Sequence, residues 1–125
     1  MKVFLETEAK LYIQQNIRNG IYDLVWSYMN DFENNDNPYD NRRDAIQLWK
    51  DIAAVQRRSS ATILETGKDI MKQGVLHKDA LHLSCAIHSQ CDYFISTDTK
   101  LLKKQINGIR LVNPIEFIDA TEAGL

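Results

Sequence analysis

The sequence predicts an α/β protein in which short strands alternate with amphipathic helices around a small parallel sheet. Three β-prone runs carry this prediction: residues 21–26, 92–96 and 109–112. Segments with helical periodicity separate them, and crossovers of that kind make neighbouring strands parallel and cover both faces of the sheet. The length of 125 residues suits a single domain, residues 1–125, with a frayed tail over residues 119–125.

The helical segments follow from the spacing of apolar residues and from the residues that end each segment. We expect helices over residues 5–19, 27–34, 39–58, 61–72, 78–89 and 99–105. Asn19 and Gly20 end the first of these, and Gly74 follows the fourth. Ser27 is a good N-cap for the second, because its hydroxyl can accept a free backbone N–H of the first turn.

Composition excludes several broad classes of function. The net charge of −2 gives no global basic field, so binding to nucleic acid must rely on local patches. Two cysteines, Cys85 and Cys91, do not make a disulfide framework, and they fit a reducing, cytoplasmic setting. The longest apolar runs are too short for a transmembrane span, and the N-terminus lacks the apolar core of a signal peptide.

Three acidic residues lie where the predicted topology favours a functional site. Asp98 follows the strand at 92–96, Asp79 opens the helix before that strand, and Glu33 lies one short helix beyond the strand at 21–26. Sites in parallel sheets form at the carboxyl ends of strands, so these acids can gather at one edge.

Clustered carboxylates repel each other unless divalent cations neutralise them. Oxygen ligands suit Mg²⁺ or Mn²⁺, which can activate a water for phosphodiester hydrolysis. Among 17 acidic residues, however, some will lie near a strand end by chance, as solvated or helix-terminal charges.

The residues around these acids resemble the PIN-domain family of ribonucleases. The family's "kDALH" segment resembles residues 78–82 (KDALH), with Gly74 shortly before, and its "cdyfiTtD" strand resembles residues 91–98 (CDYFISTD). Its closing "i.v.nP.ef" resembles residues 109–117 (IRLVNPIEF), and residues 24–34 look like the strand and helix that carry its second acid. The resemblance covers roughly residues 5–118.

The resemblance implies a three-layer α/β/α fold and endoribonuclease activity that depends on Mg²⁺ or Mn²⁺. It also implies a toxin that acts on RNA and is held by an antitoxin protein. Carried over by position, Glu33, Asp79 and Asp98 are the metal ligands and catalytic acids, and Thr97 supports Asp98 by hydrogen bonding.

The N-terminus departs from the family, which opens with a strand that ends in an aspartate. This sequence has no aspartate before Asp23, so one interpretation is that the family's first strand and loop are missing. In the other, residues 1–7 are the strand, and Glu6 replaces the aspartate as a metal ligand. Loss of a central strand would leave a gap that favours strand exchange, homodimerisation or repair by residues 1–5. A degenerate PIN domain would act instead as a noncatalytic module that binds nucleic acid or protein.

Three further side chains have both a functional and an ordinary interpretation. His82 lies one helical turn after Asp79, where it either assists the acids or packs locally. Arg42 and Arg43 either contact RNA phosphates or form part of a solvated helical face.

Overall fold

The computed structural model describes residues 2–122. Its chain divides into two compact units. Unit 1 consists of Met1–Tyr22 together with Asp92–Leu125, and unit 2 is the continuous segment Asp23–Cys91. Both units combine helices with a pair of parallel strands, so the predicted α/β class and parallel pairing are confirmed, although the described strands belong to two sheets.

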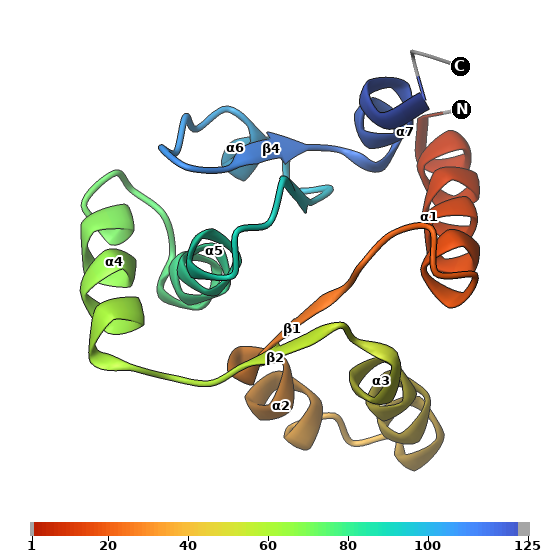
Figure 1. The fold of residues 1–125 in the computed structure, drawn as a ribbon, viewed down its shortest axis with the longest axis horizontal. Coiled ribbons are helices and arrows are strands. Elements are labelled where there is room, and N and C mark those ends of the chain that lie inside the picture. The colour runs from red at the N-terminus through yellow and green to blue at the C-terminus, as the bar shows by residue number, and fades with distance from the viewer. Residues whose placement is uncertain (1, 123–125) are drawn as a thin grey trace. The chain divides into compact units, whose positions relative to one another are not determined.

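Unit 1 is built around the packing of two helices from opposite ends of the chain (Figure 1). Its elements are α1 (Lys2–Arg18), β3 (Tyr93–Ile95), α6 (Thr99–Leu102), β4 (Arg110–Val112) and α7 (Pro114–Glu122). Strands β3 and β4 are parallel, with Tyr93 opposite Arg110 and Ile95 opposite Val112.

The core of unit 1 joins α1, β4 and α7. Ile13, Val112 and Phe117 are buried together, and the rings of Tyr22 and Tyr93 meet Phe117 edge to face at 5.0 and 5.2 Å. Such edge-to-face pairs add to the hydrophobic gain because the positive ring edge meets the negative ring face. This cluster fixes β3 and β4 against the helices, and the chain leaves β3 at Ser96.

Unit 2 contains a second parallel pair and four helices. Its elements are β1 (Val25–Ser27), α2 (Tyr28–Asn35), α3 (Asp40–Ile52), β2 (Val55–Arg57), α4 (Ala61–Met71) and α5 (His77–His88). Val25 lies opposite Val55 and Ser27 opposite Arg57. Ser27 caps α2 as predicted: its Oγ accepts the Met29 N–H at 3.1 Å, and its own N–H donates to Asn30 Oδ1 at 2.9 Å.

Helices α4 and α5 lie side by side and form most of the core of unit 2 (Figure 1). They approach closely because Gly67 has no side chain: a Cβ there would lie 3.0 Å from Leu81 Cδ2. The buried Ser84 hydroxyl donates to the Ile63 carbonyl oxygen at 2.6 Å. Helix α5 therefore presents a fully packed face, with Ala80, Leu83 and Ser84 inaccessible to solvent.

The structure corrects three sequence-based expectations. The strand proposed for residues 1–7 is wrong for its described part, because Lys2–Arg18 is helical and Glu6 lies inside that helix. The helix predicted over residues 39–58 ends at Ile52, and Val55–Arg57 is a strand. Residues 119–122 were expected to be frayed, yet they complete α7; residues 123–125 lie outside the described part.

Within residues 2–122, no helix is both long enough and apolar enough to cross a membrane.

Candidate functional site

The structure brings Glu33 to helix α5. Glu33 lies on α2, and its Oε1 contacts Nε2 of His82. The histidine side chain is largely buried, at 14% exposure, whereas the glutamate remains accessible at 42%. His82 thus holds one carboxylate oxygen of Glu33 and leaves the other available.

Asp79 stands one turn before His82, in the first turn of α5. It is half-buried, and no hydrogen bond or ion pair reaches its carboxylate from any residue of the described chain. The helix has no side-chain N-cap, because Leu76 occupies that position. The carboxylate of Asp79 is therefore favourably placed near the positive end of the helix dipole and remains free to bind a further group. Unit 2 thus has two accessible carboxylates at α5: Asp79 belongs to this helix, and Glu33 contacts it through His82.

Asp98 belongs to unit 1, where it follows β3 and caps α6. Its Oδ1 accepts the N–H groups of Lys100 and Leu101 at 3.0 and 3.3 Å. Its own N–H donates to Ser96 Oγ at 3.0 Å. The prediction that Asp98 lies just beyond the end of a strand is confirmed. One of its carboxylate oxygens, however, already caps helix α6.

Thr97 was expected to support Asp98, and its side chain makes no hydrogen bond with any residue in the range 2–122. The serine before it forms the hydrogen bond in that loop instead. A serine two residues before an aspartate can accept that aspartate's backbone N–H, and Ser96 does so here.

The arginines proposed for RNA binding both have local partners. Arg43 forms a 2.6 Å ion pair with Asp40 and donates to the Asn37 carbonyl oxygen at 3.2 Å. The Arg42 guanidinium lies over the ring of Tyr39, 4.7 Å from its centroid. These contacts order the start of α3 and occupy part of the hydrogen-bonding capacity that a phosphate would require.

One buried nucleophile lies close to these elements but is poorly suited to chemistry. Cys85 on α5 is buried, and this burial raises the pKa of its thiol above the ordinary range, although Ser27 and Arg57 act in the opposite direction. Since the thiolate is the nucleophilic form, Cys85 is expected to be inert at neutral pH.

Oxygen ligands such as Glu33 and Asp79 fit Mg²⁺ or Mn²⁺ in chemical type. Yet no group of three or more His, Cys, Asp or Glu side chains able to hold a metal ion occurs among residues 2–122. The donor chemistry therefore fits the expected cofactor, whereas the assembled ligand set does not.

His82 is the residue that sequence reasoning undervalued. Its contact with Glu33 joins side chains 49 residues apart, and the available signal was only its position one turn after Asp79.

Comparison with family models, with curated proteins and with solved structures found no match to this chain. The resemblance to PIN domains therefore depends on the sequence segments that carry it.

Proposed function

We propose that this chain is a PIN-type endoribonuclease that depends on Mg²⁺ or Mn²⁺ and acts as the toxin of a toxin–antitoxin pair. In this proposal Glu33, Asp79 and Asp98 are the metal ligands, RNA is the substrate, and an antitoxin protein and a second copy of the chain are the partners. The three-layer PIN arrangement is part of the same proposal.

The contact between Glu33 and His82 is the observation that supports this function most. It holds a carboxylate from α2 against the helix that carries Asp79, although the two acids are far apart in sequence. The Glu33 carboxylate stays accessible in this contact, at 42% exposure, so it can still bind a further group. Two accessible carboxylates at one helix are a reasonable start for a divalent cation site.

Each acid would contribute differently to such a site. A bound divalent ion would supply charge neutralisation and a water of lowered pKa. His82 is a positioning residue, since it acts on Glu33 and not on the phosphodiester. Asp98 uses Oδ1 to cap α6, which leaves Oδ2 for a ligand. Among the described residues these acids do not form a group of three ligands.

The missing ligand group favours a second candidate, a noncatalytic module that binds RNA or protein. The two candidates differ in whether RNA is cleaved, and in whether metal is required.

The decisive experiment combines calorimetric titration with Mn²⁺ and cleavage of single-stranded RNA in Mn²⁺ or in EDTA. We expect Asp79→Asn and Asp98→Asn to reduce cleavage by at least about 100-fold, the scale on which lost transition-state stabilisation acts. Asp69→Asn is the matched control, because Asp69 is an exposed acid whose partner Lys72 lies at 3.5 Å. His82→Ala should weaken Mn²⁺ binding less than Glu33→Gln does.

Cleavage that persists in Asp79→Asn and Asp98→Asn would show that these acids are not the catalytic residues. RNA binding in EDTA without cleavage in Mn²⁺ would establish the noncatalytic module.

A further inference from the structure

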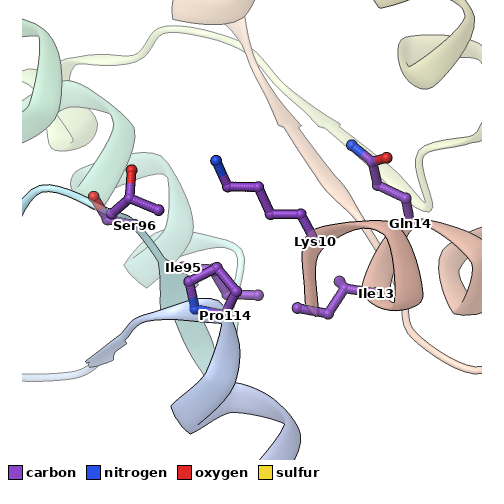
Figure 2. Close-up of a pocket in the computed structure, with 7 residues that line it drawn as sticks. Lys10, Ile13, Gln14, Ile95, Ser96 and Pro114 are labelled. Atoms are coloured by element: carbon purple, nitrogen blue, oxygen red, sulfur yellow. The ribbon is translucent and has the colours of Figure 1, made fainter. Parts of the chain in front are cut away.

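Unit 1 contains an open pocket of about 420 Å³ between α1 and the segment that follows β3. Lys10, Ile13 and Gln14 line it from α1. The opposite wall is formed by Ile95, Ser96, Thr97 and Pro114. Figure 2 shows Lys10 extending from α1 across this space toward the side on which Ser96 lies. Pockets that hold small ligands usually measure roughly 300–1,000 Å³, so this one could hold a single nucleotide.

The polar side chains of this pocket are free to bind a ligand. Within residues 2–122, the side chains of Lys10, Gln14 and Thr97 form no ion pair or hydrogen bond. Ser96 Oγ accepts the Asp98 N–H, and its hydroxyl proton remains available to donate. One ammonium group, an amide and two hydroxyls therefore line a single cavity with unused donors, a set that suits phosphate oxygens.

The nearest carboxylate in this loop does not neutralise Lys10. Asp98 directs Oδ1 to the first amides of α6, and these N–H groups stabilise its negative charge. Asp98 forms no ion pair with Lys10 in the described part of the chain, and its Oδ1 is held by backbone amides instead.

The remaining walls are apolar and suit the rest of a nucleotide. Ile13 and Pro114 are buried at the base, and Ile95 is 36% exposed at the rim. Apolar surface of this kind can pack against a ribose and a base face, while the polar groups bind the phosphate.

We propose that this pocket binds one nucleotide of single-stranded RNA, with the phosphate held by Lys10 and by the hydroxyls of Ser96 and Thr97. The inference rests on the proposed function, since it places one contact for the RNA that the acids would cleave. It places an RNA contact on unit 1 and not at Arg42 and Arg43.

The test measures binding without metal, by fluorescence anisotropy of a labelled oligouridylate in EDTA over a series of salt concentrations. Lys10→Ala should weaken binding about three- to fivefold, as expected for one exposed ion pair. It should also lower the slope of log K against log salt by about 0.7. Lys10→Arg should retain most of the affinity, because the charge is kept.

Lys103→Ala is the matched control, since Lys103 is an exposed lysine of unit 1 that does not line the pocket. An equal loss in Lys103→Ala and Lys10→Ala, or no loss in Lys10→Ala, would overturn the proposal. So would an absence of RNA binding by the wild-type chain.

Amide NMR spectra separate the sources of phosphate. Oligouridylate and uridine monophosphate should both shift the amides of Ser96 and Thr97, whereas inorganic phosphate alone should do so only weakly. Equal shifts with inorganic phosphate would overturn assignment to a nucleotide.

These results are distinguishable from failure of the proposed function. Normal RNA binding by Lys10→Ala, with cleavage lost in Asp79→Asn, would reject the pocket and keep the nuclease. Weakened binding by Lys10→Ala, with no cleavage by the wild-type chain in Mn²⁺, would keep the pocket and reject the nuclease.

Discussion

Units 1 and 2 use the same kind of elements but are closed by contacts of very different sequence separation. In unit 2 the buried bond from Ser84 to Ile63 joins residues 21 positions apart. In unit 1 the 3.3 Å contact between the hydroxyls of Tyr22 and Thr121 joins residues 99 positions apart. Unit 1 is thus closed by the two ends of the chain, with unit 2 inserted between them.

The physical consequence concerns folding rate more than stability. Loop-closure entropy grows slowly with length, so a separation of 99 instead of 21 costs only about 1.4 kcal/mol more. Local contacts form sooner, however, and we expect unit 2 to gain structure before unit 1. The packing of each unit then determines how strongly it resists local opening.

The largest effect is expected from emptying the aromatic centre of unit 1. Phe117→Ala should lower the free energy of unfolding by about 3–5 kcal/mol, because it removes a buried ring and leaves a cavity. Chemical denaturation gives the loss. Hydrogen exchange should then show the greatest loss of protection in α1 and α7, whose packing depends on this ring.

A matched substitution in unit 2 makes this comparison sharper. Leu83→Ala should cost about 2–5 kcal/mol, with loss of protection concentrated in α4 and α5. Leu48→Ala is the control, since Leu48 is 65% exposed and should change stability by less than about 0.5 kcal/mol. Uniform loss of protection in both variants would contradict independent local opening of the two units.

A smaller effect is expected from the polar contact between α4 and α5. Ser84→Ala should destabilise the protein by about 1–2 kcal/mol, because a buried hydroxyl that donates to the Ile63 carbonyl is removed. Ser59→Ala, at an exposed serine, is the control and should be nearly neutral. Denaturation midpoints that agree for the two variants would show that this hydrogen bond adds nothing to unit 2.

The smallest effect concerns the two thiols of unit 2, Cys85 inside it and Cys91 at its C-terminal end. The raised pKa of Cys85 means that the folded state holds the thiol proton more tightly than the unfolded state does. Its contribution to stability is therefore retained below the ordinary thiol pKa, about 8.5, and is lost as pH rises through the folded value. At pH 8 a thiol reagent should modify half-buried Cys91 before buried Cys85. Rapid labelling in Cys91→Ser would contradict this protection.

Local signals in the sequence were enough for several elements. The strands near 92–96 and 109–112 were predicted from β-prone runs and occur as β3 and β4. Helix α7 was missed, although Asn113, Pro114 and Glu116 carry its start signal. The Asn113 side chain accepts the Glu116 N–H at 2.7 Å, and Glu116 accepts the Asn113 N–H at 3.0 Å. This capping box, with proline at the first helical position, is readable without any tertiary information.

Strand β2 could not be predicted in the same way. Val55–Arg57 follows a helix whose apolar spacing continues through Ala53, so periodicity extended the predicted helix to Arg58. The segment becomes a strand because it pairs with β1, beginning with Val55 opposite Val25. Pairing between residues 30 positions apart is a nonlocal interaction, so local strand propensity does not predict it.

The sequence by itself determined the α/β class, most helices, the cap at Ser27 and the position of Asp98 just beyond a strand, because each depends on a few neighbouring residues. Only the tertiary structure decided that Glu33 contacts His82 and that Asp98 caps α6 with one carboxylate oxygen. It also decided that Lys10 and Ser96 line the same pocket. Each of these features depends on which residues the packing of the folded chain brings close together in space. Neighbouring residues in the sequence do not specify that packing.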